Sequence, residues 1–573
     1  MTGGGQWAAS GPYIQETGQR RVNDDRRMTG DRQRTTGSQD NPDIQTPRPT
    51  TLRRSVSAAA HKVFRRTLGN PEYNSYLYSS ILTKQTDMHP NVLLCSALFP
   101  GLAASAQSAA QNPRPEQARR PNVLFILADD LGYGDLSCYG QRKFRTPHID
   151  SLAAAGMRFT QCYAGTTVSA PSRSCLLTGT HSGHTAVRGN IELPPEGQYP
   201  LPEGAAALFL NFKKAGYATG VFGKWGLGFV GTTGEPARQG VDRFYGFNCQ
   251  LLAHSYYPDH LWSDSLRVEL ADNTDAIPYG QGSYAPDLIH AQALDFIDTA
   301  APDGPFFLFY PTTIPHAELI VPQDSIIDRF RGLYPETPYV GTDSGKSFRK
   351  GGYCSQAYPR ATFAAMVARL DRYVGELVQK LRDKGLYDNT VIIFASDNGP
   401  HREGGADPVF FDSNGIYRGY KRDLYEGGIR VPMIVAWPGH VAAGAETDFM
   451  CAFWDLPATF GELLGGRPAG GDGISLLPLL ENRAGQREHD HLYFGFMEKN
   501  GREAVRRGPW KLLHLDIRTD NPRYELYNID ADPSERHDVL DEHPAIAAEL
   551  KTLMRQAYTP DPAWPLFGDR AVQ

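Results

Sequence analysis

Two pairs of oxygen-bearing side chains each follow directly on a continuous apolar run. Asp129 and Asp130 come after the first run, and Asp397 and Asn398 come after a later one. Such runs are typical of strands in a parallel sheet that is covered on both faces, and ligands gather at the carboxyl ends of these strands. Carboxylate and amide oxygens suit Ca²⁺, or with less preference Mg²⁺, rather than zinc. Either pair alone is more typical of turns or helix caps, so the predicted metal site depends on their shared position.

A third polar group stands at the start of a predicted helix within residues 168–179, VSAPSRSCLLTG. Proline soon after a small polar residue favours a helix start, so we expect Ser169 at the helix N-terminus. Backbone N–H groups and the helix dipole favour an anion there. Arg173, four residues on, is expected one turn away on the same face. A serine-capped helix without chemistry has the same pattern, and this segment alone does not separate the two interpretations.

The elements that must position these groups begin at Pro121, where short apolar runs start to alternate with helical patterns. The clearest helix runs near residues 363–384, because its apolar residues recur at three- and four-residue spacings before Gly385. Buried strands are predicted at 122–128, 217–222, 305–310, 390–395 and 432–437, with a further helix at 205–215. This alternation predicts an α/β fold with a mostly parallel central sheet flanked by helices, over residues 121–480.

After Leu480 the pattern changes to short alternating strands. They are predicted at 491–495, 502–506, 510–514 and 524–528, and a helix is expected from about 545 to 558. We therefore predict a smaller C-terminal α+β domain with an antiparallel sheet over residues 481–573. The stretch 328–360, rich in Gly, Tyr, Ser and charge, is expected to be an inserted loop.

The composition is that of a large soluble protein. The chain has 573 residues, 40% of them apolar and 21% charged, with 7 cysteines. These values exclude fibrous, wholly disordered and disulfide-scaffold classes. The net charge of −6 conceals a basic leader, because residues 1–87 contain 13 Lys and Arg against 8 Asp and Glu. We expect this leader to be disordered, and because it lacks interleaved aromatics and a folded nucleic-acid module, we expect no nucleic-acid partner.

Residues 88–106 resemble a secretory signal peptide. The apolar run 92–104 ends in a small-residue pattern, Ala-Ser-Ala, and it is shorter than the ~20 residues needed to cross a bilayer. Because signal peptides act from the N-terminus, we interpret residues 1–87 as an artefact of start-site assignment and 107–120 as a linker. A buried apolar helix or a small-residue linker is the alternative. The prediction is an exported protein, periplasmic or secreted, without a transmembrane helix.

The helix segment carries the most specific motif. Ser-x-Pro-Ser-Arg-x-x-x-Leu-Thr-Gly, starting at Ser169, resembles the signature of the type I sulfatases, the arylsulfatase family of the alkaline-phosphatase-like superfamily, in the version with Ser at the first position. The resemblance extends over about residues 121–560. It includes Gly-Lys-Trp-Gly-Leu-Gly from Gly223, Asp-Asn-Gly from Asp397, and the stretch from Lys421 to Arg430.

The resemblance implies a sulfatase mechanism. Ser169 would be oxidised to formylglycine by a serine-oxidising maturation enzyme, and one hydroxyl of the hydrated aldehyde would attack sulfur. The four residues Asp129, Asp130, Asp397 and Asn398, with the modified Ser169, would bind Ca²⁺. Arg173 would stabilise the formylglycine oxygens, and Lys224 and Lys421 would hold the remaining sulfate charge. Each lysine alone is more typical of a solvated surface charge.

Two histidines are candidates for proton transfer by the same resemblance. His316 resembles the family's sulfate-binding or leaving-group acid histidine, and His254 the residue that assists the formylglycine oxygen. The chain departs from many members at Gly226, where they carry His. His181 and His184, just beyond the signature helix, are candidates to replace that group.

The substrate is expected by analogy to be a sulfated small molecule or glycan. Tyr257 and Trp262 are candidates for a stacking surface, although aromatics of this kind are as often core residues, and Arg188 is a candidate for binding hydroxyls or carboxylates. Two alternatives remain. One is a phosphoester hydrolase of the same superfamily, and the other is a catalytically silent Ca²⁺- or glycan-binding protein, which would result if Ser169 were not oxidised.

Overall fold

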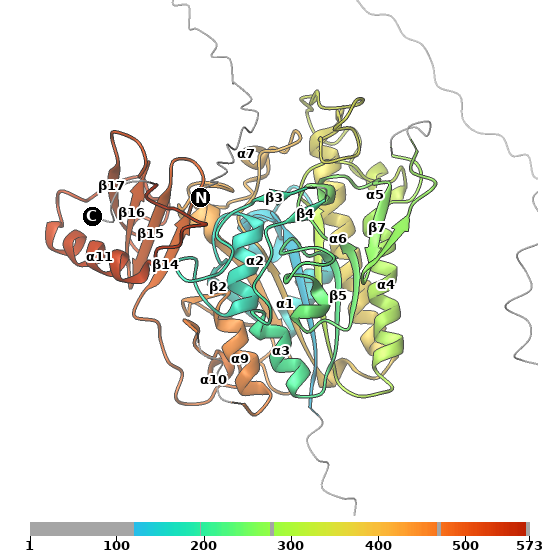
Figure 1. The fold of residues 1–573 in the computed structure, drawn as a ribbon, viewed down its shortest axis with the longest axis horizontal. Coiled ribbons are helices and arrows are strands. Elements are labelled where there is room, and N and C mark those ends of the chain that lie inside the picture. The colour runs from blue at the N-terminus through green and yellow to red at the C-terminus, as the bar shows by residue number, and fades with distance from the viewer. Residues whose placement is uncertain (1–119, 195, 275–279, 467–470, 569–573) are drawn as a thin grey trace, which may run out of the picture. The chain divides into compact units, whose positions relative to one another are not determined.

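The computed structural model describes residues 120–568 apart from 195, 275–279 and 467–470 (Figure 1). The predicted leader 1–87 and signal peptide 88–106 lie outside the described residues, as does the predicted linker except for Arg120. Among the helices of the described part, none has both the length and the apolar character required to cross a membrane.

An eleven-stranded mixed sheet forms the centre of the described unit, in the order β12-β2-β11-β10-β1-β9-β5-β6-β7-β8, with β13 paired to β2. The strands are β1 (Asn122–Asp129), β2 (Met157–Tyr163), β5 (Ala218–Lys224), β6 (Arg243–Phe247), β7 (His260–Ser263), β8 (Leu266–Glu269), β9 (Phe306–Pro315), β10 (Thr390–Ser396), β11 (Arg430–Ala436), β12 (Ala445–Thr447) and β13 (Cys451–Ala452). β10, β1, β9, β5 and β6 are mutually parallel. Their carboxyl ends therefore meet at one edge, and the predicted α/β class is confirmed.

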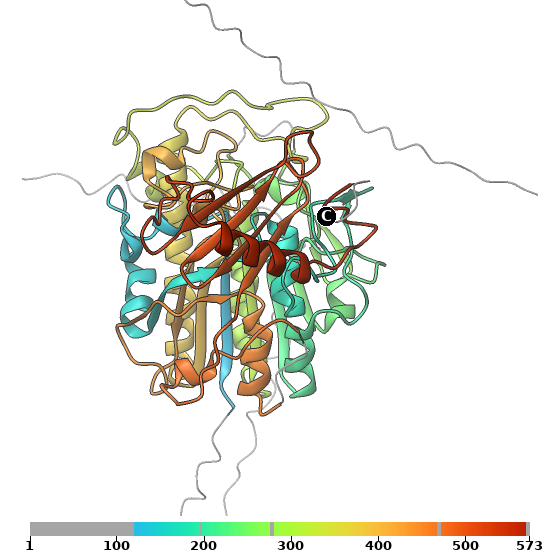
Figure 2. The same cartoon turned by 90° about the vertical axis from the view of Figure 1, so that its left-hand side faces the viewer.

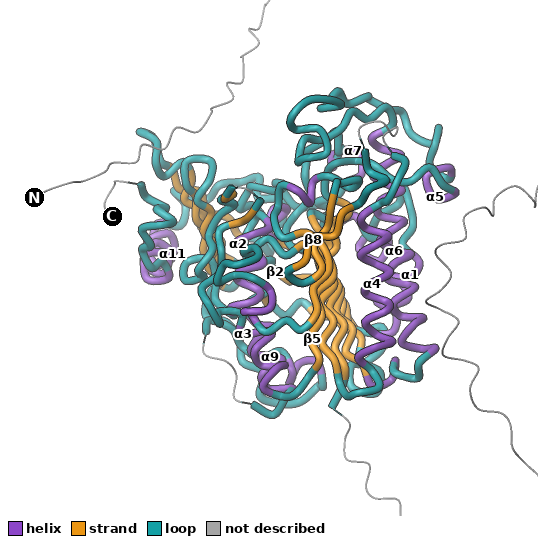
Figure 3. The backbone as a smooth tube through the Cα atoms, turned by 45° about the vertical axis from the view of Figure 1, so that its right-hand side comes forward, coloured by secondary structure: helices purple, strands orange, loops and turns teal. Residues whose placement is uncertain are grey.

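Helices cover both faces of this sheet (Figure 3). One layer holds α1 (Pro147–Ala155), α4 (Ala285–Ala300) and α6 (Pro359–Asp383), and the other holds α2 (Ser169–Thr178), α3 (Ala207–Lys214) and α9 (Asp455–Leu463). Alternate residues of β1 enter the two cores: Phe125 packs on the side of α3, and Ile126 on the side of α6. This explains why β1 has no polar face and reads as a continuous apolar run.

The remaining elements of the large unit are short. They are the ribbon β3 (Glu192–Leu193) and β4 (Gly197–Gln198), and the helices α5 (Ser325–Asp328), α7 (Pro408–Phe411), α8 (Glu426–Ile429) and α10 (Leu477–Leu480). Between α5 and α6, the described structure is loop with a single bridge between Tyr339 and Gln356. The predicted inserted loop thus lies where a loop is found.

The C-terminal part forms an antiparallel sheet of four strands, as predicted. They are β14 (Leu492–Phe496), β15 (Arg502–Arg507), β16 (Trp510–Leu515) and β17 (Arg523–Asn528), paired in sequence order. The last helix, α11 (Pro544–Ala557), packs on β15 and β16 (Figure 2).

A buried ionic cluster joins this sheet to the large one. Lys511 of β16 is fully buried, with its Nζ 3.0 Å from Glu426 Oε1 and 2.9 Å from Glu535 Oε1. Glu426 Oε2 also lies 3.1 Å from Arg430 and 3.2 Å from Arg506. Burial alone would raise the pKa of Glu426, but these three cations hold it well below its usual value. The cluster thus fixes α8, which precedes β11, against the C-terminal sheet.

Replacing Lys511 by Met tests this cluster. The Lys511→Met variant is expected to lose about 3–5 kcal/mol of unfolding free energy, because it leaves buried Glu535 without its cation and removes one of the three cations around Glu426. Guanidinium denaturation measures the loss. Arg331→Met, which breaks the exposed pair with Asp328, is the control and is expected to leave the midpoint unchanged. A Lys511→Met protein within about 1 kcal/mol of wild type would show that the cluster contributes little.

Candidate functional site

Nine polar residues meet at the carboxyl edge of the parallel strands and are called the polar edge below: Asp129, Asp130, Ser169, Arg173, Lys224, His316, Asp397, Asn398 and Lys421. All are at most 9% exposed. Strand register explains their meeting, because Ala128 of β1 pairs with Ser396 of β10, so that the acidic residues that follow lie side by side. Lys224 is the last residue of β5, and His316 comes directly after β9.

Ser169 is the first residue of α2, where the sequence predicted a helix start. It is 2% exposed. Its Oγ donates to Asp129 Oδ1 at 3.1 Å and lies 3.4 Å from Lys224 Nζ. Ser172 fixes the start of the helix, since its hydroxyl donates to the backbone carbonyl of Asp397 at 2.5 Å and accepts from the N–H of Gly165 at 3.0 Å.

Arg173 links the helix to both acidic strands. Its Nε and Nη2 donate to Asp397 Oδ2 at 3.1 and 2.9 Å, and its Nη1 donates to the backbone carbonyl of Lys224 at 2.6 Å. Its Nη2 also lies 3.6 Å from Asp129 Oδ2. Burial and the charge of Asp129 nevertheless raise the pKa of Asp397 to about 6. Asp129 behaves in the opposite way: burial would raise its pKa, but the charges of Lys224 and Arg173 hold it well below its usual value.

The four predicted metal ligands lie together. Asp130 donates its N–H to Asp397 Oδ1 at 3.1 Å, and Asn398 Nδ2 donates to Asp130 Oδ1 at 2.6 Å. The Oδ1 of Asn398 is buried without a hydrogen-bond partner. Such an orphaned amide oxygen beside carboxylates fits a hard divalent cation, which takes oxygen ligands. Asp129, Asp130 and His316 also offer ligand atoms within 4.8 Å of one another.

Lys421 and His316 form a second group around Asp130. Lys421 Nζ lies 2.9 Å from Asp130 Oδ2, 2.8 Å from His316 Nε2 and 2.9 Å from Glu403 Oε2. His316 Nδ1 contacts the carbonyl of Ala317. A carbonyl only accepts, so Nδ1 carries the hydrogen and Nε2 accepts from Lys421. Burial and the charge of Lys421 hold the pKa of His316 well below its usual value, so the ring is neutral.

Glu403 and His401 also belong to this group, although no motif in the sequence predicted them. Glu403 pairs with Lys421 and Arg422, and the ring of His401 stacks on His316 at 5.3 Å. Both belong to the loop after β10, where a charge among glycines has the pattern of a solvated turn. Only their distance of a few residues from Asp397 marked them in the sequence.

His254 is brought to the same place but contacts another histidine. Its ring stacks on His316, with centroids 4.7 Å apart and planes at 10°. Burial, with the nearby charges of Lys224 and Lys421, holds the pKa of His254 well below its usual value. His254 therefore packs against His316, while the hydroxyl of Ser169 bonds to Asp129 and Lys224.

His181 and His184, the candidates to replace the histidine missing at position 226, are paired with Asp472. Both contact Asp472, with His184 Nδ1 at 2.9 Å from Oδ2, and the two rings stack at 4.1 Å. The space at Gly226 is taken by a different residue. Gly226 has a φ of +72°, and a Cβ there would lie 2.0 Å from Gln250 Nε2. Gln250 thus takes the room of a side chain at this position.

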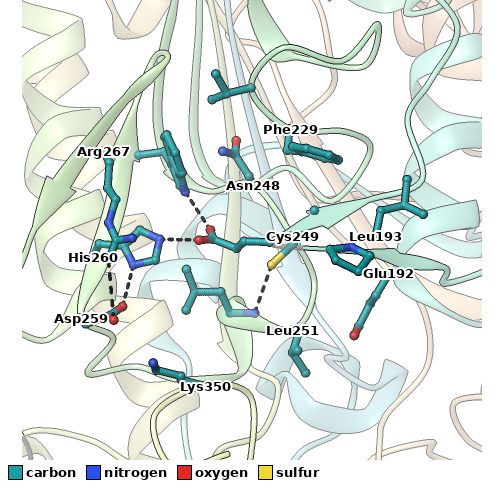
Figure 4. A pocket seen from close by; sticks show the side chains of 16 residues that line it. Glu192, Leu193, Phe229, Asn248, Cys249, Leu251, Asp259, His260, Arg267 and Lys350 are labelled. Carbon is teal, nitrogen blue, oxygen red and sulfur yellow. Dashed lines mark hydrogen bonds and ion pairs between the residues drawn. The ribbon is translucent and has the colours of Figure 1, made fainter. Parts of the chain in front are cut away.

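Two of the three proposed substrate contacts need correction. Arg188 is 3% exposed and donates to the backbone carbonyls of Thr185 at 2.9 Å and Thr559 at 2.6 Å. Tyr257 is 1% exposed, within the core. The hydroxyl of Tyr257 donates to the backbone carbonyl of Gly280 at 3.0 Å, so the polar groups of both residues are used inside the protein. Trp262 differs, since it lines a pocket of about 880 Å³ (Figure 4).

Two family models match this chain. Residues 121–466 match the model described as Sulfatase, and residues 415–559 match the model described as N-sulphoglucosamine sulphohydrolase, C-terminal. The two matches together cover the large sheet, the C-terminal sheet and the helix α11.

Curated proteins and solved structures are similar over most of the chain. An N-acetylgalactosamine-6-O-sulfatase of Bacteroides thetaiotaomicron is 30% identical over 82% of this chain and 99% of its own length. Arylsulfatase A of Homo sapiens is 32% identical over 74% of this chain and 84% of its own. The crystal structure of Ps i-CgsB in complex with k-i-k-neocarrahexaose has a TM-score of 0.64 and 28% identity, covering 78% of this chain and 95% of that chain.

The crowding at Gly226 is testable by a pair of glycine substitutions. Gly226→Ala is expected to lower the unfolding free energy by about 1–3 kcal/mol, because it strains a left-handed backbone and meets Gln250. Gly332, with a φ of +75° and nothing within 4 Å of its Cβ position, is the matched control: Gly332→Ala carries the backbone cost alone. Adding Gln250→Ala to Gly226→Ala should remove the clash, so that the double variant loses no more unfolding free energy through position 226 than Gly332→Ala loses. Equal losses for both single variants would contradict the clash.

Proposed function

This chain belongs to the sulfatase family and is a sulfuric ester hydrolase, and we propose that it acts on a sulfated carbohydrate through a formylglycine made from Ser169. The observation that carries the proposal is the position of Ser169 Oγ, 3.1 Å from Asp129 Oδ1 and 3.4 Å from Lys224 Nζ at a helix start. An unmodified serine hydroxyl is a weak nucleophile towards an anionic ester. The hydrated aldehyde of formylglycine supplies a more acidic hydroxyl and a route for releasing sulfate.

The cations of the polar edge suit an anionic substrate. Lys224 lies beside the nucleophile position, and Arg173 holds Asp397 and the backbone of Lys224 in place. Lys421 lies on the other side, against Asp130. These groups are buried and fixed by their partners, so they meet the charge that develops in the transition state with little reorganisation.

The proposed metal is Ca²⁺, with Mg²⁺ as the second choice. Asp129, Asp130, Asp397 and Asn398 would hold it, together with the modified residue 169. A bound cation would neutralise and polarise a sulfate oxygen. The orphaned Oδ1 of Asn398 and the gathered carboxylates support this assignment.

Proton transfer to the leaving alcohol is assigned to His316 together with Lys421. Lys421 Nζ donates to His316 Nε2 at 2.8 Å, so the pair shares a proton that it could pass to the oxygen of a leaving alcohol. His254 packs on the ring face of His316. In this proposal it positions His316 rather than acting on residue 169.

Carbohydrate is favoured as the substrate by the relatives. The similar proteins include an N-acetylgalactosamine-6-O-sulfatase, and a similar structure holds a neocarrahexaose.

We further propose that the protein is exported, because segment 88–106 resembles a signal peptide, and that a serine-oxidising maturation enzyme acts on it. A phosphoester hydrolase and a silent binding protein remain the rival functions.

Mass spectrometry of residue 169 tests the nucleophile. The tryptic peptide Phe159–Arg173 from protein made in its native host is expected to be about 2 Da lighter than the coded sequence, as oxidation of serine to an aldehyde removes two hydrogens. Ser169→Ala should abolish release of sulfate from 4-nitrophenyl sulfate, while Ser151→Ala, on the outer face of α1, should leave it unchanged. An unmodified peptide, or faster hydrolysis of 4-nitrophenyl phosphate than of the sulfate, would favour a rival.

Calcium binding is testable without turnover. After chelation, CaCl₂ at 100 times its dissociation constant should stabilise the fold by about 2.7 kcal/mol, with a smaller effect from MgCl₂ at the same concentration. Asp130→Asn should remove this effect. Asp472→Asn is the matched control, because Asp472 sits with His181 and His184 in a separate group of ligand atoms. Stabilisation that survives Asp130→Asn but not Asp472→Asn would place the ion elsewhere.

A further inference from the structure

We propose that the pocket beside the polar edge binds a neutral sugar unit that adjoins the sulfated one, through its hydroxyl or acetamido groups. This inference rests on the proposed function and goes beyond it, because it assigns a second subsite and the chemistry of its ligand. The pocket has a volume of about 880 Å³ and lies between β3, the end of β6, and β7 with β8 (Figure 4). Volumes of this size are typical of ligand sites rather than of packing gaps.

Two walls of the pocket are hydrogen-bonded to residues that lie next to the polar edge in the chain. β6 pairs with β5 so that Phe247 lies opposite Lys224, and Asn248 follows Phe247 at the same edge of the sheet. The backbone carbonyl of Asn248 accepts from the N–H of Gly226 at 3.0 Å. On the other side, Asn190 Oδ1 accepts from the N–H of Ala170, next to Ser169, at 3.2 Å. The chain then continues into β3, which lines the pocket.

One wall presents a fixed set of hydrogen-bonding groups. His260 lies between two carboxylates, with Nε2 at 2.7 Å from Glu196 Oε2 and Nδ1 at 2.6 Å from Asp259 Oδ1. Trp262 donates its Nε1–H to Glu196 Oε1 at 2.8 Å. This hydrogen bond fixes the indole, and Trp262 is part of the pocket lining. A rigid aromatic face beside carboxylates suits a sugar, which has an apolar face and hydroxyl groups at its rim.

Asn248 supplies the observation that points to a ligand. Its side chain is 1% exposed, and neither its Nδ2 nor its Oδ1 has a hydrogen-bond partner in the protein. A buried amide left unpaired at both ends costs stability, so it calls for a partner that both donates and accepts. Hydroxyl and acetamido groups do both. A carboxylate or a sulfate only accepts, and it would leave Oδ1 of Asn248 unpaired.

The charges of the pocket favour the same class of ligand. Glu192, Glu196 and Asp259 bring carboxylates to its lining. Of the cations there, Arg267 is already ion-paired with Glu269 at 2.8 Å and Asp259 at 3.7 Å, and Lys350 is exposed. His260 is buried, but both of its ring nitrogens are already taken by Glu196 and Asp259. An anionic sugar such as a uronate would therefore meet carboxylates without a buried cation reserved for it, whereas a neutral sugar would meet hydrogen-bond acceptors.

A binding experiment tests this assignment with unsulfated probes. The disaccharide of glucuronate and N-acetylglucosamine is compared with its carboxyl-reduced form, in which glucose replaces glucuronate, by titration calorimetry on the intact protein. The carboxyl-reduced probe is expected to bind at least tenfold more tightly. Asn248→Leu keeps the size of the side chain and removes both polar ends, so it should weaken binding of the carboxyl-reduced probe at least tenfold. Trp262→Phe should also weaken binding of this probe.

The matched control variant is Asn211→Leu on α3. The amide of Asn211 donates a hydrogen bond to the backbone carbonyl of Pro457 at 3.3 Å, and Asn211 does not line the pocket. It should bind the carboxyl-reduced probe as wild type does. The inference is overturned if that probe fails to bind, if the glucuronate form binds as well, or if Asn248→Leu binds like Asn211→Leu.

Sulfate release is measured separately, so the two proposals can fail independently. Release of sulfate from 4-nitrophenyl sulfate without binding of the neutral probe would sustain the proposed function and overturn the subsite. Binding that depends on Asn248, without sulfate release from any ester, would sustain the subsite and contradict the proposed function.

Discussion

Carboxylates gathered at one buried edge of a sheet have to be neutralised by the protein or by what it binds, and the architecture of the site follows from this requirement. Each of the three carboxylates has a cationic partner from a different segment: Arg173 from α2, Lys224 from β5, and Lys421 from the loop before α8. The same cations are the groups that suit an anionic ester. In the proposed function, structural neutralisation and substrate recognition are therefore carried out by the same side chains, so that a change to one would alter the other.

The fold divides this task between local and distant segments. Lys224 and the acidic residues are placed by the register of parallel strands, which is set by the hydrophobic core on both faces. Lys421 depends on a longer chain of contacts, because the loop that carries it leads into α8. That helix is held by Glu426, whose cations come from β11 and from the C-terminal sheet. The small sheet thus contributes to the site without supplying a residue to it.

Most of the scaffold was predictable because it obeys periodic rules. β1 and β10 are continuous apolar runs, and α6 has a clear apolar stripe, although it begins at Pro359, four residues before the predicted start. Long-range partners were not predictable. Arg188 and Tyr257 have the residue types of sugar contacts, yet tertiary packing uses their polar groups internally. Asn248 was missed because being unpaired is a property of its surroundings, which no local pattern records.

The burial of Ser169 has a consequence for the timing of biogenesis. Ser169 is 2% exposed, and the residues that follow it in α2 are buried as well. A second enzyme therefore cannot reach the side chain once the chain has folded. If residue 169 is oxidised as proposed, oxidation must precede folding, so the two processes compete for the nascent chain. A molecule that folds first remains a stable, correctly folded protein without its nucleophile. The specific activity of a preparation would then measure the fraction of molecules oxidised before they folded. Its folding stability would be the same in either case.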